Sequence, residues 1–301
     1  MTPDLFIQNL FNALTVGSLY ALIAIGYTMV YGILRFINFA HGDVFMVGAY
    51  LIFFGVTAAH MPWPLAALTA ILAASLLGVM VDRIAYRPLR EAPRISALIS
   101  AIGVSFLLEN LGLVIFTGMP RPAVQPAWMV DPITLTVGSS SIRILPLSFL
   151  VPLVTLALVL GLLWTVNHTR PGLAMRAISR DIETTRLLGV PVDRIIALTF
   201  GLGSALAAAA GLMWAMRYPQ IHPFMGVIPG FKAFIAAVVG GIGSIRGAVL
   251  GGLLLGTVEI MAVAFKPTLS GYRDAFAFIL LIAILLFKPT GLLGVKLEEK
   301  I

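Results

Sequence analysis

A short polar run interrupts the apolar N-terminal part of the chain. It reads Asn38-Phe39-Ala40-His41-Gly42-Asp43 and lies between two long apolar stretches. At membrane depth, an ionisable or strongly polar side chain is costly unless it is paired or faces water. Asn38, His41, Gly42 and Asp43 therefore either line or gate a path through the membrane, or hydrogen-bond backbone groups that a helix break sets free, and we favour the second. The lone histidine has no second ligand nearby, which predicts no metal site.

Other polar residues lie inside later apolar stretches. Glu109 and Asn110 form one pair and Glu259 stands alone, and each either faces a translocation path or pairs across helices. Lys232 is expected to extend toward the membrane surface along its aliphatic stem. A glycine-rich stretch near residue 240 favours a broken or closely packed helix, and its candidate path residues are Gly240, Gly241 and Gly243.

The segment 170–190 predicts a short amphipathic helix outside the apolar stretches. Thr169 suits the N-cap, Pro171 the first turn and Gly189 the left-handed position after the end. One face carries residues at spacings of four, four and three: Ala174, Ile178, Ile182 and Thr185. Such a helix either rests on the bilayer interface or docks into a partner subunit.

The sequence offers no chemistry of its own that would power transport. A phosphate-binding loop needs a Gly-Lys pair followed by Ser or Thr, and no Gly-Lys pair occurs in the chain. No nucleophile stands beside a general base, and cysteine is absent. We therefore predict no enzyme activity and no cofactor bound by this chain.

The elements that position these residues are membrane helices. The chain has 301 residues, 59% of them hydrophobic and 11% charged, with apolar stretches of spanning length throughout. This composition predicts an all-α, polytopic helical membrane protein with one domain over residues 1–301 and roughly eight to nine crossings. The predicted spans are 9–33, 38–58, 63–82, 95–117, 146–166, 195–217, one or two within 227–265, and 272–287.

The charges indicate how these spans are oriented. Twelve of the 20 Lys and Arg residues lie in three short stretches, at 83–94, 170–194 and 288–300. Short basic loops stay in the cytoplasm, which places the loop 167–194 and the C-terminus inside and the N-terminus outside. These basic loops also account for the net charge of +7, so the charge does not indicate a nucleic-acid partner. The Pro-rich segment 118–145 then lies outside, and its alternating residues 133–137 predict a small hairpin.

A faint internal repeat is visible. A long apolar helix followed by a glycine-punctuated segment and a further span occurs near 9–82 and again near 195–287. Repeats of this kind are common in transporters.

Several ordered strings resemble a known family. The chain is similar over about residues 9–294 to the permease subunits of branched-chain amino acid ABC importers, the LivH-type permeases. The strings that carry the resemblance are Tyr20–Gly32, Ile37–Asp43, Ala85–Arg90, Ala97–Gly103, Lys232–Phe234 and Gly240–Ser244. The second of them contains the unusual sequence Asn-Phe-Ala-His-Gly.

The resemblance implies partners and a role for the segment 170–190. Such permeases work in the bacterial inner membrane with a second, homologous permease, two cytoplasmic ATPases that bind ATP and Mg²⁺, and an extracytoplasmic binding protein that delivers the amino acid. The segment stands where the family has its coupling helix. The residues that would contact the ATPase are Ala174, Arg176, Ala177, Ile178, Arg180, Asp181 and Ile182. Arg176-Ala177 departs from the Glu-Ala-Ala form of many ABC importers.

Two alternatives stay open. The same family includes permeases for urea and amides, so the cargo can differ. A stand-alone secondary transporter or channel would instead use Asp43, His41 and Glu109 as a proton relay. The sequence is compatible both with a permease core of two identical chains and with one of two different, homologous chains.

Overall fold

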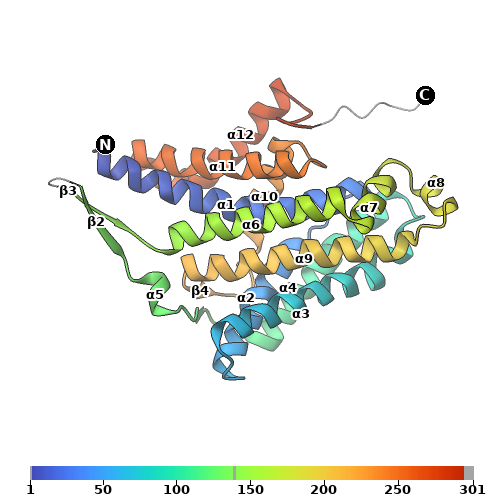
Figure 1. Cartoon of the computed structure of the whole chain (residues 1–301), viewed down its shortest axis with the longest axis horizontal. Helices are drawn as coiled ribbons and strands as arrows, with labels where there is room; N and C mark the ends of the chain where they lie inside the picture. The colour runs from blue at the N-terminus through green and yellow to red at the C-terminus, as the bar shows by residue number, and fades with distance from the viewer. Residues whose placement is uncertain (1, 138–139, 295–301) are drawn as a thin grey trace.

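The computed structural model describes residues 2–137 and 140–294. They fold mostly into helices that run side by side along the long axis of the molecule (Figure 1). The membrane helices are α1 (Pro3–Leu34), α2 (His41–Thr57), α3 (Trp63–Val81), α4 (Arg94–Phe116), α6 (Leu147–His168), α9 (Val192–Arg217), α10 (Val227–Gly240), α11 (Ile245–Phe265) and α12 (Arg273–Phe287). Shorter elements are α5 (Ala127–Val130), α7 (Arg170–Arg180), α8 (Ile182–Leu187), β1 (Arg121–Pro122), β2 (Ile133–Val137), β3 (Ser140–Ile144) and β4 (Gln220–Ile221).

The predicted all-α polytopic fold is confirmed. Seven of the helices, counted together with the turns that extend them, are long and apolar enough to cross a membrane, and α2 and α10 are shorter. Together these make nine apolar helices within the described residues. This odd number agrees with the upper value of the predicted eight to nine crossings. The predicted basic tail residues Lys296 and Lys300 and the hairpin turn Gly138-Ser139 lie outside the described residues.

The stretch 227–265 contains a short helix and a full span. Helix α10 ends at Gly240, and the following turn uses positive φ angles of 105° at Gly241 and 93° at Gly243. Such angles strain any residue with a Cβ atom, which explains the glycines. Ser244 then caps α11, because its Oγ accepts a hydrogen bond from the Gly247 N–H at 3.1 Å.

Two units of the fold repeat with opposite orientation. In each, a long helix is followed by a segment outside regular helix and then by a short helix: α1, residues 35–40 and α2, and later α9, residues 218–226 and α10. In Figure 1, α1 runs from left to right and α9 from right to left. The arrangement agrees with the predicted internal repeat and brings the starts of α2 and α10 together in the interior.

Helix α1 occupies the centre of the bundle and is buried without interruption from Thr15 to Val30. It packs against α11, α9, α10 and α6. Close approach to α11 depends on glycine, since a Cβ atom on Gly256 would lie 2.4 Å from the Gly17 Cα atom. Small residues are the usual means of helix contact in lipid, where no hydrophobic driving force acts between helices.

The predicted hairpin is confirmed, with β2 and β3 antiparallel and Ile133 opposite Ile144. It lies at the same end of the molecule as the N-terminal residues of α1 (Figure 1). The short strands β1 and β4 pair nearby and join the chain after α4 to the segment that precedes α10.

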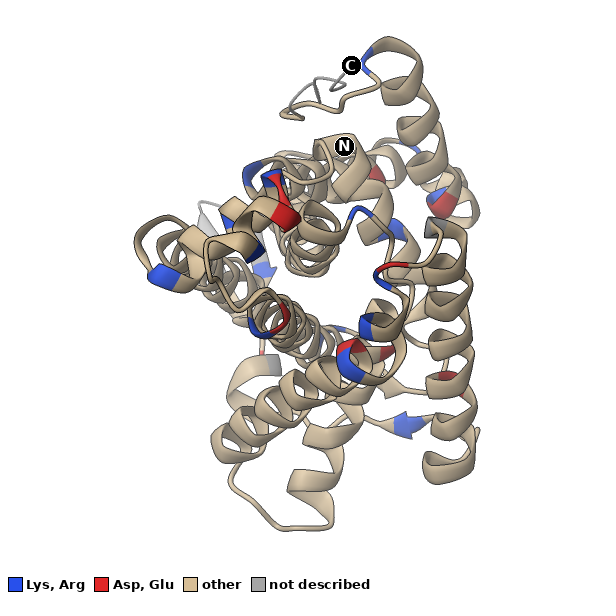
Figure 2. Cartoon of the chain, turned by 90° about the vertical axis from the view of Figure 1, so that its right-hand side faces the viewer, with Lys and Arg blue, Asp and Glu red and all other residues tan. Residues whose placement is uncertain are grey.

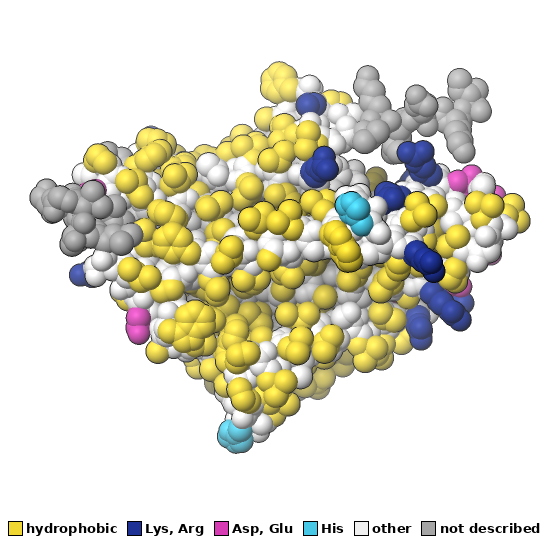
Figure 3. Space-filling view, in the orientation of Figure 1, with side chains coloured by type: hydrophobic (Ala, Val, Ile, Leu, Met, Phe, Trp, Pro, Cys, Tyr) yellow, Lys and Arg dark blue, Asp and Glu magenta, His cyan; other side chains and the backbone are white. Residues whose placement is uncertain are grey.

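The basic stretches gather at the opposite end. One cavity there is lined by residues of α1, α7, the α10–α11 turn and the chain after α12, and it includes Arg35, Arg176 and Arg180. Arg90 pairs with Asp82 at 2.6 Å and with Asp193 at 2.5 Å, which joins the end of α3 to the start of α9. Figure 2 looks onto this end and shows its Lys and Arg residues in blue, and Figure 3 shows a largely apolar band between the two ends.

The segment 170–190 differs from the single helix that its pattern predicts. Thr169 caps α7 and Gly189 has a φ angle of 80°, as expected. The helix breaks at Asp181, because that residue is extended and its carboxylate accepts a hydrogen bond from the Thr184 N–H at 3.0 Å. Asp181 thus caps a second helix, α8.

The local packing places two of the predicted ATPase-contact residues, Ile178 and Arg176, toward this chain. Ile178 is only 1% exposed and packs with Val30, Val81 and Tyr86 of this chain. In this chain the Ile178 side chain faces the interior, and its ATPase contact stays a prediction. Arg176 also turns inward and donates to the Val166 carbonyl.

Candidate functional site

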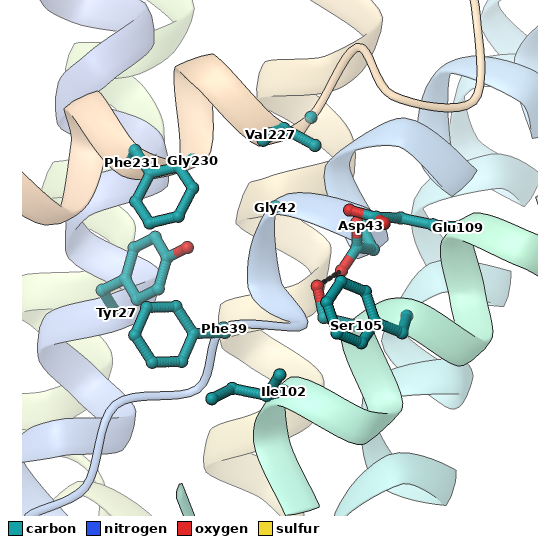
Figure 4. Close-up of a pocket in the computed structure, with 12 residues that line it drawn as sticks. Tyr27, Phe39, Gly42, Asp43, Ile102, Ser105, Glu109, Val227, Gly230 and Phe231 are labelled. Carbon is teal, nitrogen blue, oxygen red and sulfur yellow. Dashed lines mark hydrogen bonds between the residues drawn. The ribbon is translucent and has the colours of Figure 1, made fainter. Parts of the chain in front are cut away.

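A cavity lies where α2 and α10 begin. Its volume is about 330 Å³, and α1, α2, α4 and α10 supply its walls (Figure 4). The residues that line it are Tyr27, Phe39, Gly42, Asp43, Ile102, Ser105, Phe106, Glu109, Gly226, Val227, Gly230 and Phe231.

Two glycines let the short helices meet at this cavity. A Cβ atom on Gly226 would lie 1.9 Å from the Gly42 carbonyl oxygen, and one on Gly42 would lie 2.8 Å from the Gly226 carbonyl oxygen. Backbone therefore touches backbone at the point where both helices start. Interrupted helices that meet inside the membrane are a common way to build a transport site.

Asn38 and His41 hold the start of α2 from behind the cavity. The Asn38 carbonyl accepts the His41 N–H at 3.2 Å, and its side-chain oxygen accepts the Tyr86 hydroxyl at 2.6 Å. His41 is buried, fills the notch at Gly26, and packs edge-on against Tyr27 with 4.7 Å between ring centroids. These contacts fit the structural interpretation of both side chains, which stays a prediction.

Two carboxylates share one wall of the cavity. Asp43 is 2% exposed, and its Oδ2 atom accepts the Ser105 hydroxyl at 2.5 Å. Glu109 follows Ser105 by one turn of α4, and Figure 4 shows its carboxylate beside that of Asp43. Among the ion pairs of the described residues, neither carboxylate has a basic partner. Asn110 is exposed and donates to the Phe106 carbonyl at 2.7 Å instead.

The remaining walls are apolar and aromatic. The rings of Phe39 and Phe231 pack against each other at a tilt of 54°, with 6.2 Å between their centroids, and Phe106 and Ile102 complete the surface. Such a cavity accepts a hydrophobic side chain and offers a few polar groups that can fix its orientation.

Glu259 does not line this cavity. It is buried, accepts the Tyr20 hydroxyl at 2.8 Å and forms an ion pair with Lys232. Lys232 also pairs with Asp274 at 2.6 Å, and Arg273 Nε lies 3.4 Å from Glu259. The expectation that Lys232 extends to the membrane surface is wrong, because it is 6% exposed and held by these carboxylates. For Glu259, the structure shows the predicted pairing across helices.

The three predicted path glycines also lie elsewhere. Gly240, Gly241 and Gly243 form the end of α10 and its turn at the basic end of the molecule. The chain after α12 packs on this turn, since the Leu293 N–H bonds to the Gly240 carbonyl at 2.8 Å. They mark the end of a helix, and their role in the path stays a prediction.

Sequence reasoning missed several residues of the site: Tyr27, Phe39, Ser105, Gly226, Gly230 and Phe231. The sequence contains one signal that points to part of this set. The stretch 219–230 contains prolines and glycines and leads into a short apolar run. In the first repeat, residues 35–42 contain a glycine and likewise lead into a short apolar run. A pair of short, interrupted segments in corresponding positions points to a binding site.

Comparison with known proteins gives the family. A family model described as the branched-chain amino acid transport system permease component matches residues 9–285. The high-affinity branched-chain amino acid transport system permease protein BraD of Pseudomonas aeruginosa is 46% identical over 309 residues, covering 98% of each chain. The LivH permease proteins of the corresponding systems of Salmonella typhimurium and Escherichia coli are 44% identical over 312 residues, again with 98% of each chain covered. The chain therefore belongs to the family of permease components of branched-chain amino acid transport systems.

Proposed function

We propose that this chain is the transmembrane permease subunit of an ABC importer that moves branched-chain amino acids across the bacterial inner membrane. The cavity at the meeting point of α2 and α10 is the observation that carries the proposal. It has aromatic and aliphatic walls, opens on the face of α4 and α10, and is built by two interrupted helices. The cargo follows the relatives, whose names specify branched-chain amino acids.

A second permease covers the open side of this cavity. The face formed by α4 and α10 exposes Phe106, Ile228 and Phe231, and it includes the partly exposed Glu109. An ionised carboxylate facing lipid near the centre of a span costs about 2.5–3.5 kcal/mol or more. A homologous permease subunit on this face would remove Glu109 from lipid and place the cavity along the translocation path between the two subunits.

ATPase subunits dock at the basic end. Leu187 is 87% exposed and Leu188 is 77% exposed, and both extend from α8 beside Arg186. Large leucines that project among charged residues mark an interaction surface. Leu173, which is also exposed, extends this apolar surface, and the exposed Arg180 lies in the same segment. Ile178 and Ile182 pack in or against one cluster inside this chain, so the three leucines are the proposed apolar contacts.

Replacing both Leu187 and Leu188 with aspartate is expected to abolish co-purification of the ATPase subunits, because charge replaces the apolar contact. The amount of permease in the membrane should not change, since both side chains are exposed. Met119→Asp, equally exposed at the opposite end, is the matched control and should retain the ATPases. An intact assembly in the double variant would contradict the docking surface.

The proposed orientation places the hairpin end outside and the basic end inside. The chain has no cysteine, so single cysteines introduced at Met119 and Glu183 report each end separately. A membrane-impermeant maleimide should label the first in intact spheroplasts and the second only after permeabilisation. The opposite pattern would contradict both the orientation and the ATPase docking at α8.

Uptake in proteoliposomes tests the function itself. The assembled permeases, ATPases and binding protein should import leucine only when ATP is supplied, and urea or acetamide should not replace leucine. The purified chain alone should not transport. Uptake by the chain alone, driven by a pH gradient, would support a secondary transporter with Asp43, His41 and Glu109 as a proton relay.

A further inference from the structure

The two carboxylates of the cavity have no cationic partner among the residues that the structure describes. The residues that line the cavity include no Lys, Arg or His. Lys232, on the same helix as Phe231, is engaged by Glu259 and Asp274 instead. The Glu109 carboxylate makes no hydrogen bond or ion pair with the described residues, and the Asp43 carboxylate receives only the Ser105 hydroxyl from another described side chain. Asp43 is nevertheless almost fully buried.

Two ionised carboxylates in apolar surroundings are stabilised by a counter-charge, because burial removes the water that would otherwise solvate them; without a counter-charge the pair takes up a proton. An ammonium group is the counter-charge that this geometry suits. It carries three N–H donors, and the two side-by-side carboxylates present acceptors on one wall (Figure 4). The opposite walls carry the rings of Phe39 and Phe231, which fit an apolar side chain attached to the same ligand.

We infer that Asp43 and Glu109 bind the ammonium group of the amino acid in transit, with Ser105 orienting the Asp43 carboxylate and the aromatic walls contacting the side chain. This inference rests on the proposed function and names the ligand group that the cavity recognises. The cavity volume of about 330 Å³ lies at the lower end of the range for ligand pockets, which suits one small amino acid.

The inferred site separates cargo classes by charge. Leucine and 3-methylbutylamine share an ammonium group and a branched apolar chain, whereas 4-methylpentanoate has a similar chain and no amine. Urea and amides carry no ammonium group either. The carboxylates should therefore hold the first two compounds and exclude the others.

Ligand binding to the purified complex of permeases and ATPases, without binding protein, tests the site directly. Millimolar leucine and 3-methylbutylamine should each raise the thermal unfolding midpoint of the wild-type complex, and 4-methylpentanoate should not. Glu109→Gln and Asp43→Asn should each weaken the binding of both amines by about tenfold or more, since the amide keeps an acceptor oxygen but loses the negative charge that pairs with the ammonium. Asp131→Asn removes an exposed carboxylate outside the cavity and should bind as the wild type does.

The outcomes separate this inference from the proposed function. If the wild-type system imports leucine with ATP while Glu109→Gln and Asp43→Asn leave its rate, KM and amine binding unchanged, the ammonium site is wrong and the transport function stands. Equal stabilisation by 4-methylpentanoate would also overturn it. If the wild type imports urea but no leucine, the proposed cargo itself fails. Glu109→Gln keeps the test open should Asp43→Asn not fold, because Glu109 has no structural partner among the described residues.

Discussion

Replacing Gly226 with alanine is expected to abolish transport and to destabilise the protein by about 3 kcal/mol. The φ angle of Gly226 is −82°, so alanine can adopt its backbone conformation without strain. The added Cβ atom would nevertheless lie 1.9 Å from the Gly42 carbonyl oxygen. Neither side can yield by a rotamer change, because both are backbone, so α2 and α10 must separate and the cavity between them must change shape.

The unfolding midpoint of the purified protein and ATP-dependent leucine uptake by the assembled system measure this effect. Gly161→Ala is the matched control, since nothing lies within 4 Å of a Cβ atom there. It should be neutral or stabilising by up to about 1 kcal/mol, because alanine is the better helix former. If Gly226→Ala behaved like Gly161→Ala, the close contact between the two short helices would be contradicted.

The buried ion network around Lys232 should give the second large effect. Glu259→Leu leaves the Lys232 ammonium with only the exposed carboxylate of Asp274 and removes the acceptor of the Tyr20 hydroxyl. Removing one partner of a buried ion pair costs about 3–5 kcal/mol, since the remaining charge stays uncompensated. Loss of folded protein and a lower denaturation midpoint in detergent are expected.

A double variant distinguishes a buried charge from lost packing. Lys232→Met with Glu259→Gln removes both charges and keeps an acceptor for the Tyr20 hydroxyl, so stability should recover well above that of Glu259→Leu. A double-mutant cycle with Lys232→Met and Glu259→Gln as the single variants gives the coupling energy. Additive effects of the two substitutions would show that Lys232 and Glu259 do not interact.

The membrane spans could be predicted because length and hydropathy are local properties of a sequence. The break before α2 was also visible, since Asn38, His41 and Asp43 cannot continue a lipid-facing helix at low cost. The cavity walls were not predictable in the same way. Helix α1 is apolar on all sides, so its pattern gives no reason to select Tyr27 over its neighbours.

Two predictions from the sequence were wrong, one because the contact is between residues far apart in the chain and the other because two local signals compete. The partner of Lys232 lies on another helix, 27 residues away, and a basic residue within an apolar stretch does not reveal it. In the segment 170–190, the apolar spacing continues across Asp181 and suggests one helix. The Asp181 side chain prefers the capping position, so two short helices form, and Ile178 faces the interior.

The central position of α1 has a consequence for biosynthesis. Tyr20 on α1 and its hydrogen-bond partner Glu259 on α11 are separated by 239 residues. At a synthesis rate of about 5–20 residues per second, roughly 12–48 s pass between the emergence of the two residues from the ribosome. During that interval the first helix stays in the membrane without the neighbour that matches its glycine surface. Nascent chains that stop before α11 should therefore be degraded, although most of their spans are complete.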